Sequence, residues 1–462
     1  MSNDARAALD HLWALAGCNP AALDRVTLSG SDPVLPGTFK LGTAALATIG
    51  AAGLAAAELW RLRAGSGQTV SVDIKAAAAA FRSERYLRVN GQKPPDPWSP
   101  ISGFYRAADG RWLQLHCNFP HHRDGVLRVL GCGAVREEVA AAVSGWKGAA
   151  LEDELAAAGL CAALVRTAGE WREHPQAQAV AGLPLFEIAR IGDAAPEPCG
   201  SGHRPLSGVR VLDLTRVIAG PVCGRTLAEH GADVLLVTAS HLPSIDLLVM
   251  DTGRGKLSAF LDLRRADEGE RLRALIRQSD VFVQAYRPGA LAGHGFSPEE
   301  VARLRPGIVY VTLNAYGHVG PWRERRGFDS LVQCVSGIAH EGGVAAGVDG
   351  PKHLPAQAVD HGSGYLAAFA AMAALARRAR EGGSYLVRLS LAQTARWIDG
   401  LGRVDGASTP ELRLEDIDDL LQTSQTPFGV IRHVAPAARL SETPTRWARP
   451  AVPLGTHSAE WP

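Results

Sequence analysis

Alternating strand and helix patterns after residue 207 are the feature that most constrains how this chain can fold. Apolar runs suited to buried strands occur at 208–215 (GVRVLDLT), 233–239 (DVLLVTA), 279–286 (SDVFVQAY) and 307–317 (GIVYVTLNAYG). Strands of this kind, separated by helices, are typical of a parallel sheet with both faces covered. We therefore predict an α/β fold with a doubly wound sheet, whose ligand lies beyond the carboxyl ends of the strands.

Two segments of the chain resemble each other. Residues 42–91 and 361–406 each read as an alanine-rich helix, a Gly/Ser turn, an alternating strand and a second helix. Aligning Arg63 with Arg380 places Thr43 opposite Asp360. A remote duplication is therefore indicated, and only its second copy carries the carboxylate.

Asp360 begins the long alanine-rich segment AVDHGSGYLAAFAAMAAL (358–375). Local chemistry alone favours an N-cap, because an Asp oxygen accepts the free N–H groups of a first helical turn. Its negative charge also suits the positive end of the helix dipole. Gly362 and Gly364 leave room for another group to approach closely.

The composition excludes several classes of protein. Lys plus Arg number 48 and Asp plus Glu number 47, which gives no electrostatic case for nucleic acid or a membrane as a partner. Seven scattered cysteines without CxxC spacing argue against a disulfide framework and a structural zinc site. The first residues lack a signal-peptide pattern, and no transmembrane helix is expected. We expect a cytoplasmic protein.

Familiar cofactor motifs do not occur in the sequence. The first strand is followed by RVIAGPVCG, not by GxGxxG, so a dinucleotide cofactor has no support. His116, His121 and His122 lack acidic or thiol partners at ligand spacing, and we predict no metal site. The basic run RERRG (323–327) fits a solvated face, although it could hold a small anion.

Cationic residues occur in two short runs, one on a Gly-flexible loop and one at a predicted strand end. Arg254 and Lys256 lie in the flexible run GRGK, and Tyr286 with Arg287 lies just before a Pro-Gly turn. Guanidinium groups bind phosphate in bidentate fashion. Both pairs at one edge of the sheet indicate a phosphorylated ligand.

The region between the two similar segments has a different character. Residues 101–117 contain two strand-like runs around a hairpin signal at Asp109-Gly110, and helical patterns follow at 134–143 and 148–159. The Pro- and Gly-rich residues 190–206 read as a linker. The tail, 407–462, is expected to wrap over the domain or to be partly disordered.

Six ordered blocks identify a resemblance: GVRVLDLTRVIAGPVCGRTLAEHGADVLLV, GKLSAFLDLR, DVFVQAYRPGALAGHGF, NAYGHVGPW, RGFDSLVQCVSGIA and AVDHGSG. Together they are similar to the family III CoA-transferases (CaiB/BaiF), which include formyl-CoA and carnitine CoA-transferases and 2-methylacyl-CoA racemases. Residues 42–205 resemble the second half of that family, so the halves stand in permuted order. The predicted division is a smaller α+β region at 1–205, a Rossmann-like CoA domain at 206–406 and a tail at 407–462.

The resemblance implies a role for Asp360 as the nucleophile that forms an aspartyl-CoA thioester, with Gly362 and Gly364 near the oxyanion. It also implies coenzyme A, carried as an acyl-CoA substrate, a carboxylic acid as second substrate, and a homodimer. The CoA-binding residues expected from the resemblance and the strand ends are Arg254, Lys256, Tyr286, Arg287, Ala219 and Gly220.

Two departures from the family pattern bear on the choice of reaction. Ile218 stands where formyl-CoA transferases carry a glutamine, and Phe328 stands where racemases carry a histidine. A racemase needs an acid–base group on each face of the α-carbon. CoA transfer is therefore the preferred reading, and 2-methylacyl-CoA racemisation by α-proton exchange is the second. A non-catalytic acyl-CoA-binding protein is the third, suggested by VTAS (237–240) and by Thr43 in the first copy.

Overall fold

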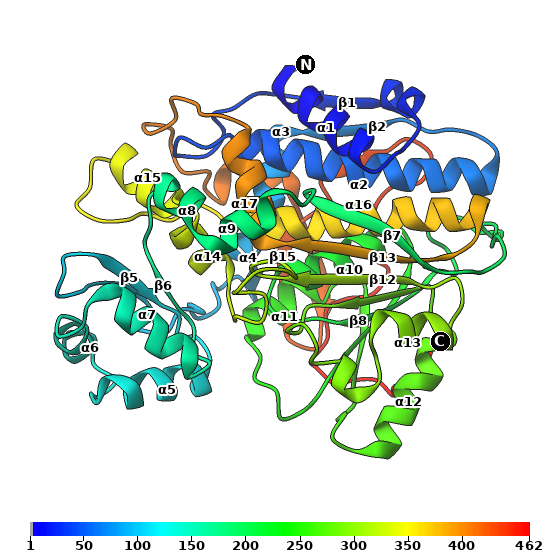
Figure 1. Cartoon of the computed structure of the whole chain (residues 1–462). Coiled ribbons are helices and arrows are strands. Elements are labelled where there is room, and N and C mark those ends of the chain that lie inside the picture. Colours follow the sequence, from blue (N-terminus) through cyan, green and yellow to red (C-terminus); the bar gives the residue numbers. More distant parts are fainter. Residues whose placement is uncertain (1–2) are drawn as a thin grey trace.

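The computed structural model describes residues 3–462, and its centre is a seven-stranded sheet (Figure 1). Six strands run parallel in the order β10-β9-β8-β11-β12-β13, and β7 joins β13 antiparallel at one edge. Their bounds are β7 Phe186–Gly192, β8 Arg210–Leu214, β9 Asp233–Thr238, β10 Lys256–Phe260, β11 Val281–Gln284, β12 Val309–Asn314 and β13 Ser384–Ser390. The doubly wound sheet is thus confirmed. The sequence analysis did not predict β10, because Lys256 and Ser258 interrupt its apolar pattern.

Helices cover both faces of this sheet. On one face α10 and α16 pack together, α2 lies on α16, and α1 lies on α2 (Figure 1). The other face carries α12 and α13 and has its own apolar cluster. The bounds are α1 Asn3–Leu15, α2 Leu41–Ala64, α10 Ala219–Glu229, α11 Asp246–Thr252, α12 Ala266–Ile276, α13 Pro298–Leu304, α14 Asp329–Val335, α15 Ile338–Ala345, α16 Ala358–Glu381 and α17 Leu391–Gly400.

Helix α2 is long and apolar enough to cross a membrane, with a mean hydropathy of 1.3 over its most apolar window. That window is completely buried inside the protein, between α1 and α16. Its alanine content gives small side chains that allow neighbouring helices to approach closely. Here α2 is a core helix.

Gly364 allows α16 to approach α10. A Cβ atom added at Gly364 would lie 2.5 Å from the Ala219 carbonyl oxygen and 2.6 Å from the Val222 Cβ. Both atoms belong to the first turn of α10, so neither can move without displacing that helix. The Asp360-bearing helix is thereby held against the turn that follows β8.

We expect Gly364→Ala to lower the free energy of unfolding by about 1–3 kcal/mol, the usual cost of overpacking a core. Gly362→Ala is the matched control, because its added Cβ would meet the Thr394 Cγ2 at 3.3 Å, where a small shift suffices. Urea denaturation of both variants measures the difference. Equal effects of the two substitutions would contradict the role assigned to Gly364.

The first copy of the duplicated pattern lies in the same body as the second. β2 (Val70–Asp73) and α3 (Ile74–Ala80) follow α2 as β13 and α17 follow α16, so the predicted element order is confirmed. Of the predicted linker 190–206, residues 190–192 belong to β7, and a loop follows them. The proposed boundary at 205 therefore does not separate two independent bodies, because β7 is part of the central sheet.

A smaller α+β unit lies to one side of this body (Figure 1, cyan). Its strands β4 (Gly103–Arg106), β5 (Trp112–Leu115) and β6 (Ala162–Leu164) form an antiparallel sheet with its own apolar core. The hairpin at Asp109-Gly110 is confirmed, and Gly110 adopts a φ of 76° that favours glycine. Its helices and those that lead back to the sheet are α5 Pro120–Leu130, α6 Arg136–Val143, α7 Gly148–Ala157, α8 Ala168–Glu173 and α9 Pro175–Ala181.

The tail wraps over the main body, which is one of the two alternatives predicted for it. β14 (Leu421–Thr426) and β15 (Gly429–Val434) form a sheet with β3 (Arg88–Val89). β16 (Ala438–Leu440) pairs with β2, which also pairs with β1 (Val26–Ser29). Further along, Trp447 covers the guanidinium of Arg254 at 4.2 Å.

Candidate active site

A cavity of about 370 Å³ opens at the carboxyl ends of β8, β11 and β12. We call it the strand-end cavity. β8 and β11 are the neighbours between which the strand order reverses, which is where open α/β sheets bind their ligands. Its lining includes Phe119, His121, His122, Arg216, Val217, Ile218, Ala219, Gly220, Tyr286, Arg287, Asn314, Arg325, Arg326, Phe328 and Asp360.

The turn between β8 and α10 is shaped for close approach. Val217 has a φ of 75°, a left-handed conformation that is strained for a β-branched residue. A Cβ atom at Gly220 would lie 2.5 Å from the Cβ of Thr215, so glycine is required there. Val217, Ala219 and Gly220 all line the cavity, and α10 directs its positive N-terminal end toward it.

The predicted site residues divide into two groups. Ala219, Gly220, Tyr286, Arg287 and Asp360 line the strand-end cavity together. Arg254 and Lys256, in contrast, are buried in the interior and are not among the lining residues. Gly362 and Gly364 also lie outside the lining, within buried α16, and the close approach that Gly364 permits is that of α10.

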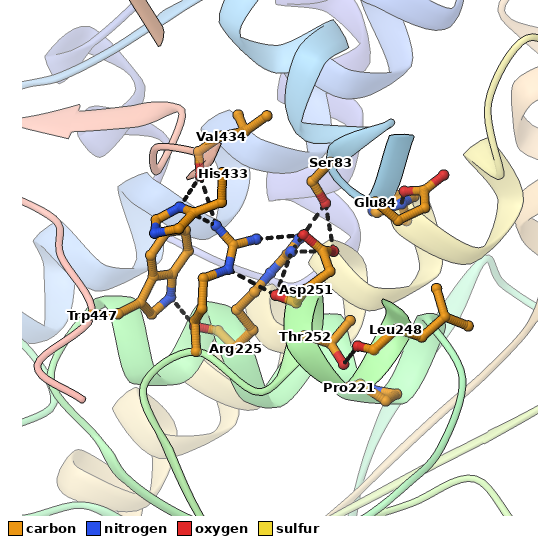
Figure 2. Close-up of polar contacts among 12 residues, drawn as sticks. Ser83, Glu84, Pro221, Arg225, Leu248, Asp251, Thr252, His433, Val434 and Trp447 are labelled. Carbon is orange, nitrogen blue, oxygen red and sulfur yellow. Dashed lines mark hydrogen bonds and ion pairs between the residues drawn. The ribbon is translucent and has the colours of Figure 1, made fainter. Parts of the chain in front are cut away.

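Lys256 and Arg254 therefore need correction as CoA contacts. The Lys256 ammonium donates to the Asp213 Oδ2 and the Pro221 carbonyl, each at 2.8 Å. Arg254 donates to Asp251 at 2.6 Å and to the Val434 carbonyl at 2.7 Å, within the polar network that Figure 2 shows. Asp213, Pro221 and Val434 are distant in the sequence from the cations that they bind, whereas Asp251 lies three residues before Arg254.

Three arginines that the sequence analysis did not place in the site line the cavity. Arg216 donates to the Pro243 carbonyl at 3.1 Å and lies 5.8 Å from the Tyr286 ring. Arg325 stacks on an indole, and Arg326 donates to the His122 Nε2 at 3.1 Å. The basic run RERRG was the available signal for the last two.

Asp360 is not the N-cap of α16. That position belongs to Gln357, and Asp360 lies in the first turn. The Asp360 backbone N–H instead donates to the Asp329 Oδ2 at 2.8 Å. A parallel arrangement occurs in the first copy, where the Thr43 N–H donates to the Asp32 Oδ2 at 2.7 Å. The capping function is thus served by another aspartate in each copy, and the Asp360 carboxyl is left for a different role.

Burial and neighbouring acids shift the titration of this carboxyl. Asp360 is 7% exposed, and burial followed by the charges of Asp329 and Glu84 raises its pKa well above the ordinary value. Burial also raises the pKa of Asp329 to about 6, although it accepts hydrogen bonds from the Asp360 amide and Gln333. Two buried acids this close favour a state in which they hold one proton between them.

Histidines surround the site without forming a metal centre. His361 lies 3.0 Å from the Glu84 carboxylate through its Nε2. His116 stacks on Phe328 at 4.0 Å between ring centroids, and burial lowers its pKa to about 3. His121 is exposed and His122 buried. Within residues 3–462, no group of three or more His, Cys, Asp or Glu side chains is placed to hold a metal ion.

A second cavity, of about 550 Å³, meets the first at Asp360. We call it the α4 cavity, because α4 (Ser83–Tyr86) and the residues around it form one of its walls. The two cavities share Phe119, Val217, Ile218, Phe328 and Asp360. Asp360 therefore lies at the junction of two spaces, one at the strand ends and one beside α4.

The model of CoA-transferase family III matches residues 4–185 and 206–401. The chain belongs to CoA-transferase family III. Asp360 and the turn after β8 both lie in the second matched segment, and the small α+β unit lies in the first.

Several family III relatives are curated as transferases. The chain is 36% identical to the acetyl-coenzyme A transferase nodX of Hypoxylon pulicicidum, over 49% of this chain and 40% of that protein. It is 29% identical to an acyl-CoA transferase of Gibberella moniliformis, over 80% of this chain and 73% of that protein. The solved structure of Rv3272 from Mycobacterium tuberculosis is 31% identical over 43% of this chain and 58% of that chain, with a TM-score of 0.38. The chain thus matches about two-fifths of the length of the first relative.

The order of the two matched segments is shared with at least one relative. Neither segment alone makes up half of this chain, so a match covering 80% of it includes residues of both. The arrangement interpreted above as permuted therefore also occurs in the Gibberella moniliformis acyl-CoA transferase.

Proposed function

We propose that this chain transfers CoA from an acyl-CoA thioester to a free carboxylic acid through an aspartyl-CoA thioester on Asp360. The observation that carries the proposal is the position of Asp360, a buried carboxyl at the junction of two cavities whose helix end is capped by another residue, Asp329. Curated transferases among the family III relatives support this class of reaction.

The proposed reaction balances without a further reagent. A carboxylate oxygen of Asp360 attacks the thioester carbonyl, and the carbon–sulfur bond breaks. This step joins the acyl group to Asp360 as a mixed anhydride and releases CoA as a thiolate. The thiolate then attacks the Asp360 carbonyl carbon, and the donor acid leaves as a carboxylate. An acceptor carboxylate attacks the resulting aspartyl-CoA, and the same steps in reverse release the new acyl-CoA and free Asp360.

The charges around the strand-end cavity suit CoA. Arg216 and Arg326 lie in its lining, Arg287 is exposed there, and all three can bind phosphate. The N-terminus of α10, at Ala219 and Gly220, adds the positive end of a helix dipole. We therefore assign CoA to this cavity and the carbon chain of the acid to the α4 cavity.

A panel of acyl-CoAs and free acids tests the proposed function. Mass spectrometry should detect new CoA esters that depend on both substrates. Exchange of the α-hydrogen of a 2-methylacyl-CoA in deuterium oxide, without a new ester, would favour the racemase instead. Binding of acyl-CoA with neither reaction would favour the non-catalytic alternative.

Arg287→Gln should weaken CoA binding by about 10- to 100-fold, the loss expected for one charge-assisted hydrogen bond of about 1.5–3 kcal/mol. Calorimetry with CoA measures the effect. Arg413→Gln is a suitable control, because Arg413 is an exposed tail residue that pairs with Asp416 and does not line the strand-end cavity. Unchanged CoA affinity in Arg287→Gln would remove Arg287 from the site.

Both walls of the site come from a single chain. Phe119 and His122 lie at the small α+β unit, and they line the same cavity as Ile218 and Asp360 of the main body. The homodimer that the resemblance implies remains a prediction. A second copy is not needed to bring these walls together.

A further inference from the structure

Glu84 is a buried acid that lies beside the first turn of α16. It is 8% exposed and lines the α4 cavity, as Asp360 does. Its Oε2 accepts from the Nε2 of His361 at 3.0 Å, and His361 directly follows Asp360 in that turn. Its Oε1 lies 3.7 Å from the Nε of Arg85, which is exposed. Glu84 is therefore joined to the residue next to the proposed nucleophile.

The ring of His361 depends on Glu84 for its orientation. His361 is completely buried, and within residues 3–462 its Nδ1 has no hydrogen-bond partner. The Phe81 ring stacks on it at 5.9 Å between ring centroids, which restricts the tilt of the imidazole but not its rotation within its own plane. The hydrogen bond from Nε2 to Glu84 therefore fixes that rotation.

The position of Glu84 is fixed by the buried ion network of the main body. Ser83, the first residue of α4, donates to the Asp251 Oδ2 at 2.7 Å and accepts from Arg225 at 3.0 Å. Figure 2 shows Ser83 and Glu84 on this short helix, next to the pair formed by Asp251 and Arg225. Glu84 is thus held by contacts that do not involve Asp360.

The internal duplication supports a link between the Glu84–His361 pair and the nucleophile. The alignment used above places Ala44 opposite His361. It also places Leu401 opposite Glu84, so the first copy has neither member of the pair. Both copies form the same helix, strand and helix, and packing of these elements alone therefore does not require the pair. The copy that lacks the pair is also the one that has Thr43 in place of the nucleophile.

The charges around Asp360 favour the proposed attack on a thioester. Burial, and then the charges of Asp329 on α14 and Glu84 on α4, raise the pKa of Asp360. Asp329 and Asp251 also lie close enough to His361 to interact with its charge. When the Asp360 carboxylate attacks, it becomes a neutral acyl group, and the negative charge passes to the CoA sulfur. The attack thus relieves the repulsion between Asp360 and its neighbouring acids.

We propose that Glu84 is a positioning residue for CoA transfer, which orients His361 and, by its negative charge, makes Asp360 a stronger nucleophile. This inference rests on the proposed function. Glu84 touches no reacting atom in this role and acts through its neighbours. A purely structural pair would need only the hydrogen bond between Glu84 and His361, whereas the proposed role also needs the charge. Substitutions that keep one and remove the other therefore separate the two roles.

Glu84→Gln removes the charge, while its amide oxygen can still accept from His361. The maximum rate of transfer should fall several-fold. Its decline at low pH should begin about one pH unit below that of the parent, because a neighbouring negative charge no longer raises the pKa of Asp360. Glu84→Asp keeps the charge, so its pH profile should stay close to that of the parent. The transfer rate is measured across the pH range in which each protein stays folded.

A second measurement does not depend on turnover. The raised pKa of Asp360 gives stability at low pH that is lost as the pH rises, so Asp360→Asn should gain stability over the parent as the pH rises. In a Glu84→Gln background this gain should be smaller and should level off about one pH unit lower. Urea denaturation of the parent, the two single variants and the double variant measures this coupling.

Glu229→Gln is the matched control. Glu229 is the last residue of α10, and burial raises its pKa to about 7. It lines neither cavity. The substitution removes one buried carboxyl, as Glu84→Gln does, but it should shift neither the pH profile of transfer nor the stability gain of Asp360→Asn. A general loss of structure would affect both variants alike.

The possible outcomes distinguish this inference from the proposed function. A parent-like pH profile in Glu84→Gln, in a protein that transfers CoA, would reject the inference and retain the proposed function. Equal shifts in Glu84→Gln and Glu84→Asp would also reject it, because only one of them removes the charge. So would equal stability gains of Asp360→Asn in both backgrounds. Absence of transfer by the parent, with the stability coupling intact, would reject the proposed function and retain the action of the Glu84 charge on Asp360.

Discussion

Replacing Asp360 with asparagine should reduce CoA transfer by about four orders of magnitude or more, the scale seen when a covalent nucleophile is removed. The amide is a poor nucleophile, yet it has nearly the same size and leaves the backbone N–H that donates to Asp329 unchanged. CoA affinity should therefore remain close to that of the parent. Coupled turnover assays and calorimetry measure the two quantities separately.

A covalent intermediate provides an independent measurement. Incubation of the parent protein with acyl-CoA, followed by hydroxylamine or borohydride, should mark Asp360 specifically, because both reagents react with an aspartyl thioester. The Asp360→Asn variant is the matched control and should carry no mark. Parent-like transfer by this variant would exclude Asp360 as the nucleophile, and α-hydrogen exchange without a mark would favour racemisation.

The same substitution should stabilise the fold. Burial raises the pKa of Asp329 to about 6 and that of Asp360 further, so the folded state holds protons more tightly than the unfolded chain. The associated stability is present at low pH and is lost as the pH rises through these pKa values. Above about pH 6, Asp360→Asn removes one of two buried acids and should gain roughly 1–3 kcal/mol.

Near pH 4 both carboxyls are protonated, and parent and variant should unfold with similar free energies. Urea denaturation across this pH range measures the divergence. Transfer by the parent should also fall as the pH is lowered, because Asp360 takes up a proton and no longer supplies an anionic nucleophile. The fall should begin above pH 6, because the pKa of Asp360 lies above that of Asp329. A pH-independent difference in stability would show that the two acids do not share a proton.

Local patterns were enough to predict the main sheet and part of the site. Apolar runs marked β8, β9, β11 and β12, and the rule that ligands lie at strand ends brought Tyr286, Arg287 and Gly220 to one cavity. Each of these inferences depends on residues close together in the sequence. The role of Asp360 could not be predicted from local patterns alone, because its local chemistry is equally that of a helix cap.

The remaining features depend on pairs of residues that are distant in the sequence. Lys256 looked like a phosphate ligand until its partner Asp213, on β8, was located. Arg82 belongs to the first matched segment and contributes to a cavity that contains Asp360 of the second. Neither relationship produces a periodic pattern or a motif in the sequence. Burial converts some apparent ligands, such as Lys256, into structural ion pairs.

Asp251→Asn should lower the free energy of unfolding by about 3–5 kcal/mol, the cost of breaking a buried ion pair by removing one partner. Asp251 is 1% exposed, and its carboxylate lies 2.8 Å from Arg225 and 2.6 Å from Arg254 (Figure 2). Burial alone would raise its pKa, but these two arginines outweigh burial and hold it below the ordinary value. Asparagine would leave two buried cations without a counter-charge.

Asp416→Asn is the control for this measurement, because Asp416 pairs with Arg413 at the surface, where an ion pair contributes about 0–1 kcal/mol. Urea denaturation compares the two variants. A cost below about 1 kcal/mol for Asp251→Asn would mean that the Val434 carbonyl and the Trp447 ring are enough to hold Arg254.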